Sequence, residues 1–327
     1  MTNVAIACQG GGSHTAFTAG VLDQVLPWLD DHDCDLVGLS GTSGGAMSAA
    51  AAWSGYLDGG PQAACETLRE IWADVVVSGP AERAINAWFV KLIELNHAGA
   101  PVPGLSPYQV PWADLGQQQF RRVLERHVAF DRFPALAAEP DAPKLVIGTV
   151  DVEAGDFETF TDGEVTSEAI LASAAIPTLF EAVEIHGHAH WDGLFSQNPP
   201  INDLLAVDVD RKPDELWIVQ INPQTTDDVP RSLGDINDRR QELSGNISLN
   251  QEVRFIERVN DWIAEGDLSD QYKPVEVRKI VLDRQFGFGS KFERSPGFVG
   301  DLMDEGRETA ADFVDEIEAD LHGHEHH

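Results

Sequence analysis

The sequence predicts an α/β fold with a mostly parallel central sheet. Within the first 60 residues, two short apolar runs, 3–8 and 35–40, each stop at a glycine-rich turn and lead into a helical pattern. Apolar runs of this length that end in glycines are typical of buried strands. A strand followed by a helix, twice in succession, indicates parallel strands joined by crossover helices.

The first helix is expected to begin at Ser13, whose hydroxyl can cap it, and to run to about Trp28. The second helix is the alanine-rich run 46–53. Further segments that are uniformly apolar or alternate in polarity predict strands: 144–150, 156–161, 180–191, 215–221 and 275–282. Helical patterns cover 61–128 (with breaks near 79–80 and 98–107), 167–175, 231–263 and 296–321.

A polar stretch at 223–230 is the clearest boundary and predicts two parts, 1–224 and 225–327. The second part is expected to be mostly helical and to pack on the first. Six apolar residues of its long helix are the expected core contacts: Ile236, Leu243, Ile247, Phe255, Val259 and Trp262. The chain ends in a His-rich stretch, His322–His327, which we interpret as a disordered tail rather than a metal site.

The charge balance excludes whole classes of function. Asp and Glu number 55 against 22 Lys and Arg, which gives a formal net charge of −33. Binding to nucleic acid or to anionic lipid requires a basic surface, which this composition does not favour. The hydrophobic fraction of 43% is that of a folded protein rather than of a disordered acidic chain. The carboxylate excess and the scarcity of Lys favour a protein adapted to high salt over an ordinary acidic cytosolic protein.

Cysteine usage and the N-terminus predict a cytoplasmic location. Cys8, Cys34 and Cys65 lack metal-type spacing, which indicates a reducing compartment without disulfides. The N-terminus has no basic region of the kind that begins a signal peptide. The uncharged stretch 36–57 approaches the length of a membrane span, but its Gly and Ser content favours a strand, a turn and a helix instead. We therefore expect no transmembrane segment.

One pentapeptide fits the G-x-S-x-G pattern of a nucleophilic serine: Gly41-Thr42-Ser43-Gly44-Gly45. It lies between a predicted strand and a predicted helix, which is the context that gives the pattern meaning. The sharp turn brings its flanks together, which explains the glycines, and it holds the Ser43 hydroxyl above the sheet edge. The N–H groups of the helix start favour developing negative charge there. The alternative is a turn that merely caps a helix. Such a turn needs no strand before it, so the predicted strand favours the nucleophile.

A second glycine turn, Gly10-Gly11-Gly12, follows the first predicted strand. Its bare N–H groups suit an oxyanion hole, which holds the negative oxygen of a tetrahedral intermediate. A dinucleotide-binding loop is excluded because Thr15 replaces the third glycine and no acidic residue ends the second strand. A P-loop is excluded because no Gly-Lys-Ser/Thr follows. A simple packing turn is the remaining alternative.

A hydroxyl nucleophile needs a base. Asp192-Gly193 ends the alternating segment 180–191, where a loop carboxylate can face the sheet edge. His186, His188 and His190 are alternatives, because a Ser-His-Asp triad is a common solution. Their spacing places all three on one strand face together with Asp192, and an exposed hairpin face also explains them. Spacing alone leaves the base open.

Four motifs in this order resemble those of the patatin-like phospholipases: Gln9–Gly12, Gly41–Gly45, Ala172–Pro177, and Asp192-Gly193 with Asn198-Pro199. The resemblance covers about 3–222. It implies a three-layer α/β/α patatin-like fold and a Ser-Asp dyad without histidine or a cofactor. By position it implies Ser43 as nucleophile, Asp192 as base, and Gly10, Gly11 and Gly12 as the oxyanion loop, with Gly41, Gly44, Gly45 and Gly193 as supporting residues. The segment 235–252 resembles the C-terminal extension of a bacterial and archaeal subgroup.

The chain departs from the family pattern in its glycine loop. That loop often begins with Asp and continues with Arg or Lys and then Gly, whereas here the positions hold Gln9, His14 and Thr15. The loss of the usual basic residue at His14 is expected to affect rate and substrate. The nucleophile is unaffected.

The resemblance implies a serine acyl-ester hydrolase acting on phospholipid or neutral lipid. One alternative is a depolymerase of intracellular polyhydroxyalkanoate granules with the same dyad, and another is an inactive scaffold that coats lipid or polymer granules. Each would meet a hydrophobic surface, for which Trp88-Phe89-Val90 and Phe286-Gly287-Phe288 are candidate docking segments, with core packing as the alternative. The net charge disfavours anionic bilayers unless salt screens it, with a Debye length of about 3 Å at 1 M.

Overall fold

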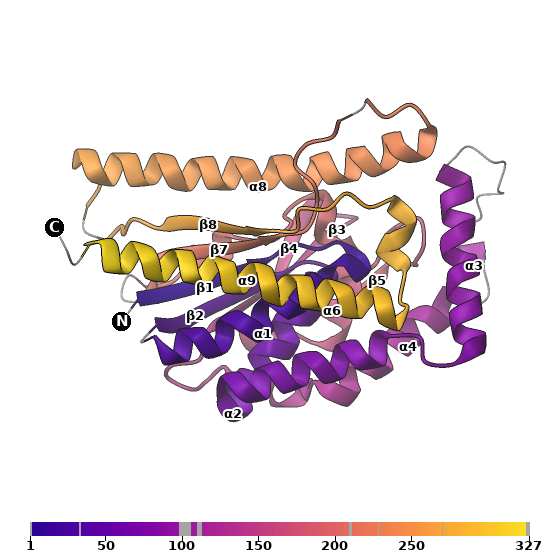
Figure 1. The fold of residues 1–327 in the computed structure, drawn as a ribbon, viewed down its shortest axis with the longest axis horizontal. Helices are drawn as coiled ribbons and strands as arrows, with labels where there is room; N and C mark the ends of the chain where they lie inside the picture. Colours follow the sequence, from indigo (N-terminus) through magenta and orange to yellow (C-terminus); the bar gives the residue numbers. More distant parts are fainter. Residues whose placement is uncertain are drawn as a thin grey trace.

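The computed structural model describes residues 2–32, 34–97, 106–109, 113–208, 211–227, 229–269 and 271–324. Its centre is one mixed sheet with the strand order β5-β6-β3-β2-β1-β7-β8, and β4 also pairs with β3. The strands are β1 (Thr2–Cys8), β2 (Cys34–Gly41), β3 (Lys144–Asp151), β4 (Asp156–Thr161), β5 (Val183–Ile185), β6 (His188–Asp192), β7 (Glu215–Gln220) and β8 (Glu276–Val281). Helices cover both faces (Figure 1), which confirms the predicted three-layer α/β/α architecture.

The longer helices are α1 (Ala16–Asp31), α2 (Gly44–Val75), α3 (Pro80–His97), α4 (Ala113–His127), α8 (Leu233–Glu265) and α9 (Pro296–His324). Shorter pieces connect them: η1 (Gly12–Thr15), η2 (Pro107–Gln109), η3 (Phe130–Arg132), α5 (Phe133–Leu136), η4 (Asp162–Glu164), α6 (Ser167–Ser173), η5 (Gly193–Phe195), α7 (Asn202–Leu205) and η7 (Phe288–Phe292). Among the described residues, no helix combines the length and apolar composition needed to cross a bilayer.

The parallel part of the sheet forms the core. β1 pairs in parallel with β2 and β7, and both of its faces are buried. Val4, Ile6 and Cys8 face the hydrophobic cluster that includes residues of α1, α2 and α9. Ala5 and Ala7 face the cluster that includes residues of α8. Burial on both faces is the reason that these strands are uniformly apolar in sequence.

The N-terminal helices begin and end at other residues than predicted. A 3-10 turn, η1, separates the glycine loop from α1, so Ser13 does not cap α1, which begins at Ala16. The alanine-rich helix is the first part of α2, which runs to Val75 with a break inside it. Its backbone leaves the helical region only at Gly59 and Gly60, where φ of Gly60 is +78°. The glycine pair therefore separates two helical parts, and the second part begins near Pro61, where a helical pattern was predicted to start.

The prediction for the packing face of α8 was wrong. Five of its six expected core residues are exposed: Ile236, Leu243, Ile247, Phe255 and Trp262. The buried face carries Leu249, Val253 and Ile256, and near the candidate site it carries the small or polar residues Gly245 and Asn246. A Cβ on Gly245 would lie 3.2 Å from the Leu194 carbonyl oxygen, so the helix approaches the loop after β6 too closely for a large side chain.

The C-terminal part contributes a strand as well as helices. β8 pairs in parallel with β7 and extends the sheet, and α9 packs along α1 (Figure 1). The backbone of α9 stays helical to His324, so half of the stretch expected to be a disordered tail belongs to a helix. The remainder, 325–327, lies outside the described residues. All three cysteines are free, as predicted.

Candidate active site

Ser43 lies in a strained turn between β2 and α2. Its φ of 57° and ψ of −126° are unusual for a residue other than glycine. A Cβ on Gly41 would lie 2.5 Å from the backbone of Gly45, so the turn is too tight for a side chain there. The Ser43 N–H donates to Ser173 Oγ at 2.9 Å. The strand, the sharp turn and the helix form the geometry expected for the G-x-S-x-G motif.

Asp192 is fully buried at the end of β6, two strands from β2 in the sheet. Its Oδ1 accepts the Leu194 N–H at 2.9 Å. Burial raises the pKa of Asp192 to about 7, while the Leu194 N–H and the Ser43 side chain act in the opposite direction. Within the described part of the chain, Oδ2 has no hydrogen-bond partner of standard geometry. The neighbours of the two residues are in contact, because a Cβ on Gly193 would lie 3.1 Å from Thr42 Cγ2, and the Ser43 side chain lowers the pKa of Asp192. The structure thus brings Ser43 and Asp192 together.

The three histidines do not join this pair. His186 lies in the hairpin turn between β5 and β6, with φ of 53°. His188 is exposed and its Nδ1 lies 2.8 Å from Asp151 Oδ2. His190 is buried, against the expected exposed face, and its Nε2 lies 2.6 Å from Glu158 Oε2. Each paired imidazole therefore faces a carboxylate other than Asp192.

These histidines and their carboxylates form two overlapping groups with the spacing of metal ligands, and both groups share Asp151. Asp151 Oδ1 accepts the backbone N–H groups of Glu153 and Ala154, each at 2.9 Å. Glu153 in turn accepts the Ala189 N–H at 3.1 Å. Each side chain of these groups therefore has at least one ion-pair or hydrogen-bond partner within the protein.

The glycine loop lies directly against the nucleophile. A Cβ on Gly10 would lie 2.9 Å from Ser43 Cβ and 2.6 Å from the Thr42 carbonyl oxygen, which only a glycine avoids. The Gly10 N–H donates to Asn198 Oδ1 at 2.6 Å, and the Gly10 carbonyl accepts from Asn222 Nδ2 at 2.9 Å. Of the three loop N–H groups, that of Gly10 is thus already bonded within the protein.

A buried amide network supports the loop, and no motif in the sequence marks it. Gln9 Oε1 accepts the N–H groups of Ile221 and Asn222, both at 2.8 Å. Gln9 Nε2 donates to Asn246 Oδ1 on α8 at 2.9 Å. An Asp at this position lacks the N–H donor, so Gln9 fits a loop that is bonded to α8. Asn222 and Asn246 carry no local motif, and nothing in the sequence pairs them with residue 9.

His14 is buried beside the loop and neutral. Its Nε2 lies 2.7 Å from Ser290 Oγ, and its ring centroid lies 4.6 Å from that of Phe286. Burial, together with the positive charges of Lys291 and Arg284, lowers the pKa of His14 to about 3. The position that often holds a charged residue in the family therefore holds an uncharged one here.

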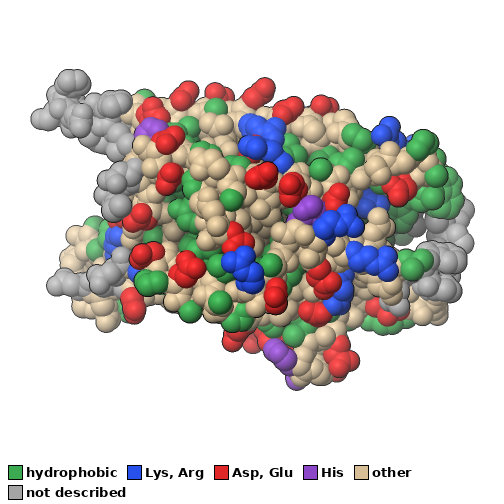
Figure 2. All heavy atoms as spheres, turned by 90° about the horizontal axis from the view of Figure 1, so that it is seen from below, with side chains coloured by type: hydrophobic (Ala, Val, Ile, Leu, Met, Phe, Trp, Pro, Cys, Tyr) green, Lys and Arg blue, Asp and Glu red, His purple; other side chains and the backbone are tan. Residues whose placement is uncertain are grey.

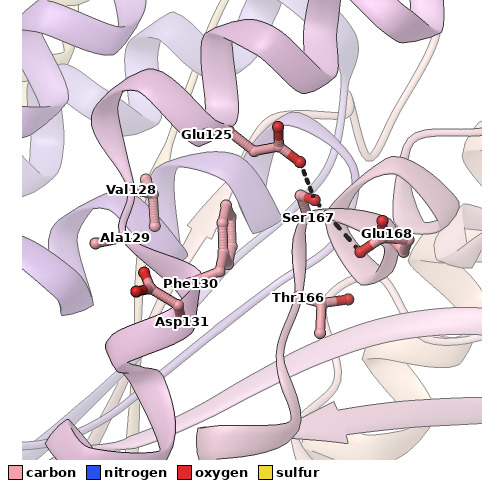
Figure 3. Close-up of a pocket in the computed structure, with 8 residues that line it drawn as sticks. All are labelled: Glu125, Val128, Ala129, Phe130, Asp131, Thr166, Ser167 and Glu168. Carbon is pink, nitrogen blue, oxygen red and sulfur yellow. Dashed lines mark hydrogen bonds between the residues drawn. The ribbon is translucent and has the colours of Figure 1, made fainter.

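A hollow of about 480 Å³ lies between the end of α4 and the start of α6 (Figure 3), and neither Ser43 nor Asp192 lines it. Its lining includes the carboxylates of Glu125, Asp131 and Glu168, and Ser167 Oγ donates to Glu125 Oε1 at 2.8 Å. An acidic lining does not suit an acyl chain. Ser43 itself is 6% exposed, so an ester has to enter the protein to reach it.

A family model described as patatin-like phospholipase matches residues 6–205. None of the curated proteins matches the chain. Among solved structures, VipD from Legionella pneumophila is 12% identical with a TM-score of 0.44, over 96% of this chain and 67% of that one. The type III effector ExoU is 15% identical with a TM-score of 0.35, over 96% and 53%.

The ExoU–SpcU complex from Pseudomonas aeruginosa gives 14% identity and a TM-score of 0.30, over 78% of this chain and 52% of that one. The chain thus spans about half the length of the ExoU chains that it matches. The family model covers more than half of the chain and includes the glycine loop from Gly10, Ser43 and Asp192. The chain therefore belongs to the patatin-like phospholipase family, whose description indicates a hydrolase of lipid esters.

Proposed function

We propose that the chain hydrolyses lipid acyl esters with a Ser43–Asp192 dyad. Asp192 takes the Ser43 proton while the serine oxygen attacks the ester carbonyl carbon. The tetrahedral intermediate collapses, the alcohol leaves with the proton from Asp192, and the acyl group stays on Ser43. Asp192 then takes a proton from water, the resulting hydroxide attacks the acyl-enzyme, and Ser43 regains a proton as the acid is released.

The observation that carries the proposal is the pairing of a strained serine turn with a buried carboxylate whose pKa is raised to about 7. A base whose pKa is near neutral combines a useful ionised fraction with a useful affinity for the proton. The Gly11 and Gly12 N–H groups are the proposed oxyanion donors, because Asn198 already occupies that of Gly10. In this account Gly10 keeps the loop close to Ser43.

Phospholipid and neutral lipid are the proposed substrates. The net charge of −33 favours a lipid surface without anionic headgroups. The same charge, read as adaptation to high salt, keeps the polyester of intracellular polyhydroxyalkanoate granules as a second candidate. The chemistry of the dyad suits either ester, so the choice between lipid and polyester depends on which surface the protein binds.

Hydrolysis of a short-chain nitrophenyl ester in high salt tests the dyad. Wild type is expected to be active, and Ser43→Ala and Asp192→Asn are expected to be inactive. His188→Ala and His190→Ala are matched controls from the same strand and should retain activity. Activity in Asp192→Asn together with its loss in the histidine variants would refute the dyad.

The substrate is tested by comparing phosphatidylcholine, triacylglycerol and native polyester granules under one salt condition. Release of fatty acid from either lipid at a rate above that of Ser43→Ala supports the proposal. Hydrolysis of the granules alone would replace the lipid substrate by the polyester. Equal rates for wild type and Ser43→Ala on all three substrates would favour the hypothesis of an inactive scaffold that coats granules.

A further inference from the structure

Helix α3 presents an apolar stripe to the outside of the molecule. Ile85 is 67% exposed and Trp88 is 65% exposed, and Phe89 and Leu95 are also exposed. Their spacing along the sequence places them on one side of the helix. We name these four side chains the α3 stripe. Figure 2 shows hydrophobic side chains gathered at the end of the molecule where α3 lies.

The opposite side of α3 is tied to the rest of the protein. Asn86 Nδ2 donates to the Phe292 carbonyl at 2.8 Å, and Asn86 Oδ1 accepts the Arg294 N–H at 3.0 Å. Phe292 ends η7, and the Lys291 carbonyl of η7 lies where a Cβ on Gly12 would be. One 3-10 turn therefore separates the α3 helix from the glycine loop of the proposed active site.

The α3 helix differs from the rest of the chain in charge. Residues 76–112 carry two acidic and two basic side chains, a net charge of zero, whereas the whole chain carries −33 over 327 residues. The charges on α3 are also compensated locally. Lys91 Nζ lies 3.1 Å from Glu94 Oε2, and the Glu82 carboxylate accepts the N–H groups of Ser78 and Gly79.

We propose that the α3 stripe docks the protein on an uncharged lipid surface, which rests on the proposed function because that surface holds the substrate. An apolar helix face with aromatic side chains and no net charge enters the headgroup boundary through buried apolar area alone. Docking through this face sets the end of the molecule that carries the glycine loop against the lipid. Ser43 is buried, so the ester has to leave the lipid surface and enter the protein at this end.

Helix α8 is the rival docking face, because it also exposes apolar side chains such as Ile247 and Phe255. Residues 233–265 carry seven acidic side chains and four Arg, so this helix keeps the negative charge of the chain. α3 lies at the N-terminal end of α8 (Figure 1). Phe255 follows about 33 Å along the helix from its first residue, at 1.5 Å per residue. It is 56% exposed and provides a matched exposed aromatic for a control.

The test is flotation with phosphatidylcholine vesicles in high salt, in parallel with hydrolysis of a soluble nitrophenyl ester. Wild type and Phe255→Asp are expected to float with the vesicles. The double variant with Ile85→Asp and Trp88→Asp should bind about tenfold or more weakly, because two apolar side chains no longer enter the lipid. All three proteins should hydrolyse the soluble ester at the same rate. Trp88→Ser adds no charge and should weaken flotation, although less than the double variant does. This single variant carries the test if the double variant does not fold.

Four results overturn the proposal: no flotation of wild type, equal flotation of the α3 variants, loss of flotation in Phe255→Asp instead, or binding to polyester granules but not to vesicles. Stronger flotation with anionic phosphatidylglycerol vesicles in dilute buffer would overturn the choice of an uncharged surface. Failure of wild type to hydrolyse the soluble ester would contradict the proposed function. Flotation is read independently of hydrolysis, so the two failures are distinguishable.

Discussion

The buried carboxyl of Asp192 predicts how activity depends on pH. Its pKa is raised to about 7, and a general base acts only when ionised. The value of kcat/KM for a soluble ester should therefore rise through pH 7 to a plateau. At pH 6 it should be about one-tenth of the plateau, because one pH unit below the pKa leaves about a tenth of the carboxyl ionised. Asp192→Asn removes the base and should lower kcat/KM by about 10² to 10⁴, with a flat profile.

The same substitution should raise stability above pH 7. An unfolded Asp ionises near pH 3.9, whereas the folded Asp192 carboxyl binds its proton up to about pH 7. The folded state thus binds more protons between these values, and wild-type stability falls as pH rises from about 4 to 7. A difference of about three pKa units corresponds to at most about 4 kcal/mol. Asn keeps the Oδ1 acceptor for the Leu194 N–H and cannot ionise.

Urea unfolding of wild type and Asp192→Asn at pH 4.5 and pH 8, in the same high salt, measures this difference. The Asn variant should be the more stable protein at pH 8, and the gap should narrow at pH 4.5. A variant that is inactive and also less stable at pH 8 would refute the argument from burial. So would a wild-type kcat/KM profile without an inflection near pH 7.

Other variants test the packing around the site. Gly10→Ala should lower kcat by about 10² or more through misplacement of the nucleophile, with Gly300→Ala as control, since a Cβ there meets nothing within 4 Å. Asn246→Ala should lower stability by about 1–3 kcal/mol, as read by urea unfolding, because the buried Gln9 amide loses one of its two acceptors. Leu249→Ala should lower the free energy of unfolding by about 2–5 kcal/mol, and Ile247→Ala should lower it by less than about 1 kcal/mol. The opposite order would mean that the face of α8 with Ile247 packs on the protein. Transfer to dilute buffer should lower the Tm because the net charge is then unscreened.

The sheet was predictable because its central strands are buried on both faces. The runs 3–8, 35–40, 144–150 and 215–221 correspond to β1, β2, β3 and β7, and the middle of each run is free of charged and polar side chains for that reason. The packing face of α8 was not predictable. Its inner face meets a polar network near the site, so it carries Gly245 and Asn246, while the larger Phe255 points outward. Hydrophobic periodicity therefore selects the wrong face.

The candidate site was predictable as far as its motifs extend. Ser43 follows β2 and Asp192 ends β6, and both strands pair with β3, so the ends of these strands place the two residues together. The three histidines share the spacing of a catalytic group with Asp192, and only the pairing of β4 and β6 with β3 assigns His190 to Glu158. Partners such as Asn246 come from distant segments, and no local pattern marks them.

The most direct test of the central claim is covalent labelling. A fluorophosphonate forms a stable bond to an activated serine, and peptide mass spectrometry locates it. We predict labelling at Ser43 in wild type, labelling at least a hundredfold slower in Asp192→Asn, and none at this position in Ser43→Ala. Ester hydrolysis by wild type with the label on another residue, or undiminished hydrolysis by Ser43→Ala, would contradict the account.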